Sequence, residues 1–205
     1  DSGGNTLWTS DGSGNLSSLN GALSGSLKLL NTTTADDTSS ISFTVGSTYD
    51  VYMFEFINII PVTSTKSLKM QGSTTSTYTN NIPQTTIYFY TNNAEDDTQG
   101  ILEKSNFYSA GQTTGYQIIM PEMSNGASAS STATLFLFGP GSTTYVKHYC
   151  TKTSALFWGG GSANPRSMSS YVGGYFNSTE AMTQVNFKMD SGNIASGDLK
   201  MYGLS

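Results

Sequence analysis

Short runs that alternate apolar and polar residues constrain the fold of this chain more than any other feature. Ile41, Phe43 and Val45 alternate with Ser42 and Thr44, which is the period of a strand with one face buried. Amphipathic helical spacing is nearly absent, because Gly, Asn or β-branched runs interrupt every candidate stretch. The sequence therefore predicts an all-β protein.

Turn residues divide the chain into many short strands. Residues 51–60 are apolar at nearly every position, so we expect a strand with both faces covered that ends at Pro61. Turn-forming combinations such as Asn125-Gly126 separate the others. This spacing favours an antiparallel β-sandwich of the jelly-roll type. Further strands are predicted over residues 68–70, 87–90, 116–120, 135–138, 145–149, 155–158, 185–189 and 199–202.

The 205 residues fall within the range of one domain. Residues 1–23 are rich in Gly, Ser and Asn and carry few apolar residues, so we expect an extended N-terminal arm or linker there. Residues 24–205 hold the strand pattern and are predicted to form the β-sandwich domain. The arm is too poor in apolar residues for a core of its own, but it could dock on a neighbouring subunit.

Charge and hydropathy exclude several classes of partner. The net charge is -5 and the chain holds nine Lys and Arg, too few for a basic stripe that neutralises phosphates, so we expect no nucleic acid. No apolar run approaches the roughly 18 residues that span a bilayer, and the first residues lack the pattern of a signal peptide. We therefore expect no membrane insertion. Cys150 is the only cysteine, which fits assembly in a reducing cytoplasm.

Catalytic chemistry would have to involve His148, the only histidine, which stands two residues before Cys150 in one predicted strand. Positions i and i+2 share a strand face, but nucleophilic catalysis also needs an orienting group and an oxyanion hole. No Gly-x-Ser-x-Gly elbow is present in a strand-to-helix context. We therefore interpret this pair as a polar ring beside a packed thiol and predict no catalytic residue and no enzyme.

Carboxylates cluster at Asp36-Asp37 and at Glu95-Asp96-Asp97. Glycoside hydrolysis needs two carboxylates roughly 5 to 10 Å apart, and a loop calcium needs spaced oxygen ligands. Both clusters are expected in polar loops, and neither matches a calcium-loop pattern. We expect them to face water, and we predict no metal and no cofactor.

Aromatic residues in polar surroundings are the remaining candidates for ligand contact. Tyr78, Tyr108, Tyr171 and Tyr175 lie in or beside Gly- and Ser-rich stretches, where an exposed ring can stack on a sugar. The competing interpretation is that each ring is a half-buried packing residue of a strand.

The last segment, residues 183–204, resembles the closing hairpin of jelly-roll domains in tail fibre and other virion proteins of tailed bacteriophages. Apolar alternation is followed there by Ser191-Gly192-Asn193, a strand, and Tyr202-Gly203. Residues 40–52 and 58–61 fit the same family. The resemblance implies a virion location, commonly a homotrimer, and no catalytic residue, because the shared pattern is structural.

Two functional hypotheses follow, and the first is favoured. It is a non-enzymatic virion protein of a fibre or a capsid decoration, assembled in the host cytoplasm. Its expected partners are its own copies and other virion proteins, with a host-surface glycan as a further candidate. The alternative is a carbohydrate-binding module or lectin-like domain of a secreted protein. A bacterial surface adhesin is less favoured, since we expect an export or anchoring signal in one.

Overall fold

The computed structural model describes residues 8–10, 12–13, 16–19, 27–76, 82–157 and 165–204, and these residues form strands and their connections. No helix long and apolar enough to cross a membrane occurs among them. The all-β prediction is confirmed. The strands are β1 (Trp8–Ser10), β2 (Leu16–Leu19), β3 (Leu27–Thr38), β4 (Ile41–Thr44), β5 (Val51–Pro61), β6 (Lys66–Ser73), β7 (Gln84–Ala94), β8 (Gly100–Lys104), β9 (Gln117–Met123), β10 (Ser131–Phe138), β11 (Lys147–Phe157), β12 (Arg166–Phe176), β13 (Gln184–Met189) and β14 (Ile194–Leu204).

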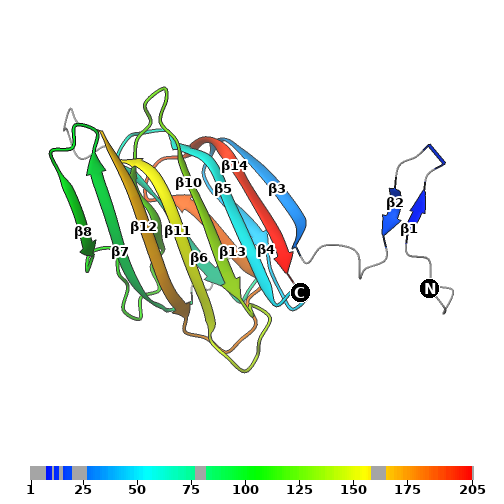
Figure 1. Cartoon of the computed structure of the whole chain (residues 1–205). Coiled ribbons are helices and arrows are strands. Elements are labelled where there is room, and N and C mark those ends of the chain that lie inside the picture. Colours follow the sequence, from blue (N-terminus) through cyan, green and yellow to red (C-terminus); the bar gives the residue numbers. More distant parts are fainter. Residues whose placement is uncertain are drawn as a thin grey trace.

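Twelve of the strands form one antiparallel sheet, while β1 and β2 pair only with each other. The main path runs β3-β14-β5-β10-β11-β9-β6-β13-β4, and its two end strands, β3 and β4, contact each other. The sheet is therefore nearly closed into a barrel. Strands β12, β7 and β8 branch from β11 as an extension on one side, seen at the left of Figure 1. The antiparallel prediction is confirmed, but this continuous sheet does not confirm the sandwich or jelly-roll detail.

Phenylalanines fill the interior between the long strands and β4, β6 and β13. The Phe187 ring on β13 lies 5.0 Å from Phe56 and 5.4 Å from Phe54 of β5, between ring centroids, and Phe43 of β4 completes the group. All four rings are buried and meet edge to face, the arrangement that aromatic quadrupoles favour. The inward positions of β4 are those that its alternation predicted. β5 was expected to be covered on both faces, but Val51, Glu55 and Ile57 on its second face are only half-buried.

Buried polar side chains fix the segment between β8 and β9 against the barrel. Tyr149 Oη donates to Gln84 Oε1 at 2.8 Å, and Gln84 Nε2 donates to the Gly115 carbonyl at 2.9 Å. Thr86 Oγ1 donates to Gln117 Oε1 at 2.7 Å. Buried polar groups need such partners because an unmet hydrogen bond in the interior is costly.

Several local predictions are corrected. Residues 145–149 and 155–158 were expected to be separate strands, but Lys147–Phe157 is one long strand and Tyr145 lies in the turn before it. The final two strands were expected to form a hairpin, yet β13 pairs with β4 and β6 while β14 pairs with β3 and β5. Their short connection crosses from one side of the barrel to the other instead.

Candidate functional site

Seven strands share one broad outward face. Along β3-β14-β5-β10-β11-β12-β7 residues that point into the barrel alternate with residues that point away from it, apart from register shifts in β3, β5 and β14. In β11, for example, Tyr149 and Thr151 are buried whereas His148, Cys150 and Lys152 are exposed. We call this surface the outer face. Because the strands are in register, its residues lie in rows that run across the sheet.

One row across all seven strands contains no charged residue, and we call it the apolar row. Successive members are paired in register on neighbouring strands. The row spans six strand spacings of about 4.8 Å, or roughly 29 Å. Exposure reaches 51% at Ile87 and 52% at Leu29, the members on its two outermost strands. The members are Ile87, Gly173, Cys150, Phe136, Met53, Tyr202 and Leu29.

The next row towards the same end of the sheet extends this surface. Phe138 pairs with Val51, which pairs with Leu204, and Leu204 pairs with Leu27. Phe138 is 41% exposed and Leu27 is 46% exposed. With a rise of about 3.4 Å per residue, the first row over seven strands and the second over four cover roughly 300 Å² in plan. Apolar patches of this size on a single chain often serve a function.

Charged residues begin in the row on the other side of the apolar row. Lys152, Thr134, Glu55 and Lys200 are paired across β11, β10, β5 and β14. Tyr202 Oη donates to Glu55 Oε2 at 2.8 Å, which ties the apolar row to this border. That hydrogen bond to a carboxylate raises the pKa of the Tyr202 hydroxyl. The uncharged surface is thus flanked by charges of both signs.

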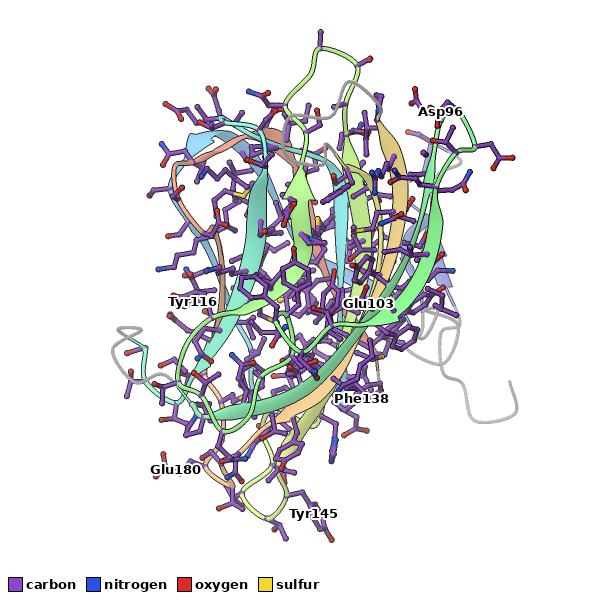
Figure 2. The ribbon with its side chains drawn as sticks, turned by 90° about the vertical axis from the view of Figure 1, so that its left-hand side faces the viewer. Asp96, Glu103, Tyr116, Phe138, Tyr145 and Glu180 are labelled. Carbon is purple, nitrogen blue, oxygen red and sulfur yellow. The ribbon has the colours of Figure 1, made fainter. Side chains whose placement is uncertain are left out.

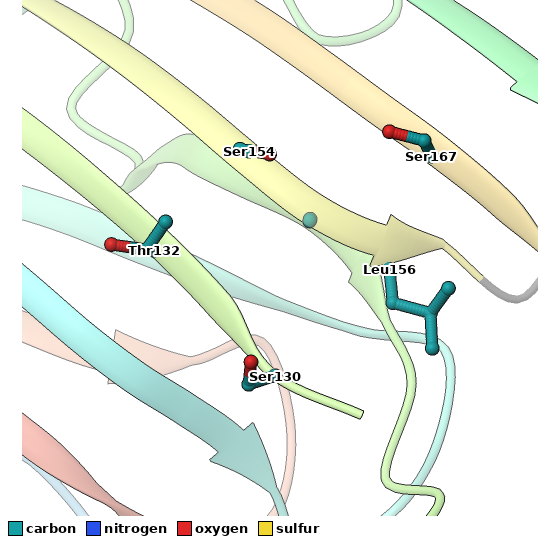
Figure 3. A pocket seen from close by; sticks show the side chains of 6 residues that line it. Ser130, Thr132, Ser154, Leu156 and Ser167 are labelled. Atoms are coloured by element: carbon teal, nitrogen blue, oxygen red, sulfur yellow. The ribbon is translucent and has the colours of Figure 1, made fainter. Parts of the chain in front are cut away.

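Hydroxyl groups occupy the following row, which we call the hydroxyl row. It consists of Thr91, Ser169, Ser154 and Thr132 on β7, β12, β11 and β10. A groove of about 240 Å³ opens beside it, as Figure 3 shows. Hydroxyls can both donate and accept hydrogen bonds, so the groove suits a neutral polar ligand. It is lined by Ser130, Thr132, Ser154, Ala155, Leu156 and Ser167.

Two of the four predicted ligand-contacting tyrosines lie on the outer face. Tyr171 stacks on Phe89 with ring centroids 4.9 Å apart, and Lys152 Nζ lies 6.0 Å from the Tyr171 centroid. Tyr175 lies four residues further along β12, and its ring packs against the His148 ring with centroids 5.7 Å apart. Both rings are half-buried. Tyr171 follows Ser169 on the same face and so stands at the border of the hydroxyl row.

The other two tyrosines do not join them. Tyr108 lies after β8, where its ring packs 5.1 Å from Tyr88 and its hydroxyl donates to Glu122 Oε1 at 2.6 Å. Burial, followed by that hydrogen bond, raises the pKa of Tyr108 well above its ordinary value. Its hydroxyl is therefore engaged within the fold. Tyr78 lies outside the described residues.

His148 and Cys150 share the outer face, as the i and i+2 spacing predicts. Burial raises the pKa of the Cys150 thiol, whereas a nucleophilic cysteine needs a lowered one. The described residues contain no group of three His, Cys, Asp or Glu side chains placed to hold a metal ion. This surface therefore offers packing and hydrogen bonding, and its one thiol is disfavoured as a thiolate.

The two carboxylate clusters are far apart. Asp36 and Asp37 belong to β3 rather than to the loop that was expected, while Glu95–Asp97 form the turn between β7 and β8. Six strand spacings, roughly 29 Å along the sheet, separate β3 from β7. A glycosidase pair needs about 5 to 10 Å, so these clusters do not make one.

Sequence reasoning missed the apolar row because it missed β3 and β12, which carry Leu29 and Gly173. One sequence signal could have revealed this face. Ile87 and Phe89 on β7, and Phe136 and Phe138 on β10, are large apolar residues at the alternate positions that face away from the core. Comparison with known proteins does not identify a function for this face, because no family model, no curated protein and no solved structure matches the chain significantly.

Proposed function

We propose that the chain is a non-enzymatic structural subunit of a tailed-phage particle, located in a fibre or on the capsid surface, and that it associates as a homotrimer through its outer face. The apolar row is the single observation that carries this proposal. The phage assignment and the threefold symmetry rest on the resemblance of residues 183–204 to virion jelly-roll domains.

The chemistry of the outer face supports self-association. Stable interfaces bury about 800 Å² on each partner, with an apolar centre and a polar rim. The two apolar rows supply roughly 300 Å² of uncharged centre, and the Lys152–Lys200 border supplies the rim. Aromatic residues such as Phe136 and Tyr202 are the type that most often contributes binding energy. The contact would leave the loops at the ends of the barrel accessible.

Those loops give the proposed subunit its second role, attachment to other virion proteins or to a host-surface glycan. A loop contact repeated around a symmetry axis gains avidity, so no individual site needs high affinity. The low charge of the chain, 11% of residues, suits neutral packing between copies.

The test of self-association is a matched pair of substitutions on β10. Phe136→Lys places a charge in the centre of the apolar row, and Thr132→Lys places the same charge four residues away on the same face, in the hydroxyl row. Light scattering should show a loss of the trimer for Phe136→Lys only, because burying an unpaired ammonium is costly. Equal masses for both variants and the parent chain would contradict the proposal.

A second candidate function, a carbohydrate-binding module, is favoured by the groove beside the hydroxyl row. Its hydroxyls and the neighbouring Tyr171 ring are the groups that bind sugars. A module of this class binds polysaccharide as a monomer and loses retardation in polysaccharide-containing gels when Tyr171→Ala removes the ring. Retardation that survives in Phe136→Lys and disappears in Tyr171→Ala would favour this candidate over the structural subunit.

A further inference from the structure

Strand β8 is the open edge of the twelve-stranded sheet. The two ends of the main path, β3 and β4, contact each other, and β12 and β7 each have neighbours on both sides. Within the part of the chain that the structure describes, β8 pairs with β7 alone, and all five of its residues are exposed. Figure 2 views the molecule from the side on which β8 lies, with Glu103 of this strand labelled. An open strand edge is a template for pairing with another chain.

The hydrogen bonds at both ends of β8 show which backbone groups face the open edge. Ala94 N–H donates to the Gln99 carbonyl at 2.8 Å, and Ser105 N–H donates to the Tyr88 carbonyl at 2.9 Å. Bonding direction alternates along an antiparallel strand, so the odd-numbered residues 99–105 bond β7. The N–H and C=O groups of Gly100, Leu102 and Lys104 therefore point to the open side.

Apolar side chains accompany these backbone groups. Leu102 is 79% exposed and Ile101 is 40% exposed, and Phe107, just beyond the strand, is 83% exposed. Leu102 is paired with Thr91 of β7 and so lies on the outer face, next to the hydroxyl row rather than the apolar row. This edge is thus a separate surface from the one proposed for the trimer.

We propose that β8 pairs with β8 of a second copy of this chain, antiparallel about a twofold axis at Leu102. In this register Gly100 faces Lys104 of the other copy, Ile101 faces Glu103, and the two Leu102 residues face each other. The free groups of Gly100, Leu102 and Lys104 then all bond across the axis. The contact goes beyond the proposed function, because it is independent of the apolar row and would join one trimer to another.

Charge selects this register from its neighbours. A twofold axis at Lys104 would put two ammonium groups opposite each other, and an axis at Gly100 would put Glu103 opposite Asp97, pairs of like charge that are destabilising. With the axis at Leu102, Lys104 of each copy comes beside Gly100 of the other, three residues after the acidic turn Glu95–Asp97. Asp96 of that turn is labelled in Figure 2. The complementary charges therefore favour a second copy as the occupant of the edge.

Disulfide trapping tests the register directly. Directly opposed, hydrogen-bonded residues of an antiparallel pair have Cα atoms about 5.5 Å apart, within the range that a disulfide bridges. In a Cys150→Ser background, Leu102→Cys should give a covalent dimer on mild oxidation, visible on a non-reducing gel of the native protein. Thr91→Cys is the matched control, because its position is on the same face one strand further from the axis and should give only background dimer. A Leu102→Cys chain that stays monomeric on the gel, or that dimerises no more than Thr91→Cys, would overturn the proposal.

A second variant tests the edge by native mass. Leu102→Pro removes a donor that faces the open side and leaves the bonds to β7 in place. In Phe136→Lys, which lacks the face contact, we expect dimers, and adding Leu102→Pro should convert these to monomers. If the single variant Phe136→Lys is a monomer, the edge pairing is overturned and the proposed trimer is not. If Phe136→Lys keeps the mass of the parent chain, the trimer is contradicted and the edge pairing is not.

Discussion

The two halves of the outer face differ in chemistry although they lie on the same strands. Four residues along β10 separate Phe136 from Thr132, and four along β7 separate Ile87 from Thr91. All four side chains point away from the core, so strand alternation alone does not distinguish them. One half carries large apolar groups without charge, and the other carries hydroxyls beside a groove. Under the proposed function, another copy covers the apolar half, and the hydroxyl half stays in contact with solvent.

Giving the apolar half the chemistry of the hydroxyl half should have the largest effect on self-association. Phe136→Thr with Ile87→Thr makes the apolar half resemble the hydroxyl half, and each central apolar residue of an interface contributes about 2 kcal/mol when it is a hot spot. We expect the dissociation constant of the face contact to rise several-hundredfold, measured by sedimentation velocity. A rise below threefold would mean that these rings do not lie in an interface.

Thiol accessibility gives a smaller effect that compares the halves without adding charge. Cys150 lies in the apolar row and Ser154 occupies the matching position in the hydroxyl row of β11. A maleimide should modify Ser154→Cys in a Cys150→Ser background about tenfold faster than it modifies native Cys150, because the interface covers Cys150 and burial raises the pKa of its thiol. Dilution or Phe136→Lys should bring the two rates closer. Equal modification rates at the two positions in the associated protein would contradict the claim that association covers the apolar half and leaves the hydroxyl half accessible.

Alkaline pH should weaken the apolar half alone. The Tyr202 hydroxyl donates to Glu55, which raises the pKa of Tyr202 above its ordinary value near 10. A raised pKa means that the hydrogen bond is fully present below about pH 10 and is lost as the pH rises through the raised value. We expect constant association between about pH 6 and 9 and a fall above about pH 10, with Tyr202→Phe as the control that lacks the titrating group. An equal alkaline fall in Tyr202→Phe would assign the loss to another group.

Removing one hydroxyl should have the smallest effect. Ser154→Ala deletes a solvent-exposed group from the hydroxyl row, and surface substitutions of this kind change the free energy of unfolding by less than about 0.5 kcal/mol. Neither urea unfolding nor native mass should change measurably. A change in mass would show that the hydroxyl half also takes part in association.

The local sequence pattern predicted those strands whose own residues alternate or form an apolar run. Ile41–Thr44 and Val51–Pro61 match the predicted segments because their apolar spacing reflects burial. β12 was missed because Arg166–Phe176 is rich in Ser and Gly, and β3 because it carries Thr, Asn and Asp. Both are extended because they pair with neighbouring strands: β12 with the preceding β11 and with the distant β7, and β3 with the distant β14.

The apolar row could not be predicted from local sequence pattern. Its members come from seven strands, and only the register of six pairings brings Leu29 and Phe136 into one line. Of the four tyrosines named from composition, Tyr171 and Tyr175 reach this face, because alternation along β12 places them outward. Composition identified these ring types, but strand pairing decides which of them lie together.

The central claim is that the apolar half of the outer face joins copies of the chain, and native mass tests it most directly. Light scattering across a hundredfold dilution should give a mass that settles at three times 21.8 kDa, with a further increase at the highest concentrations where β8 edges pair. A parent chain whose mass never exceeds that of Phe136→Lys at the same concentration would contradict the account.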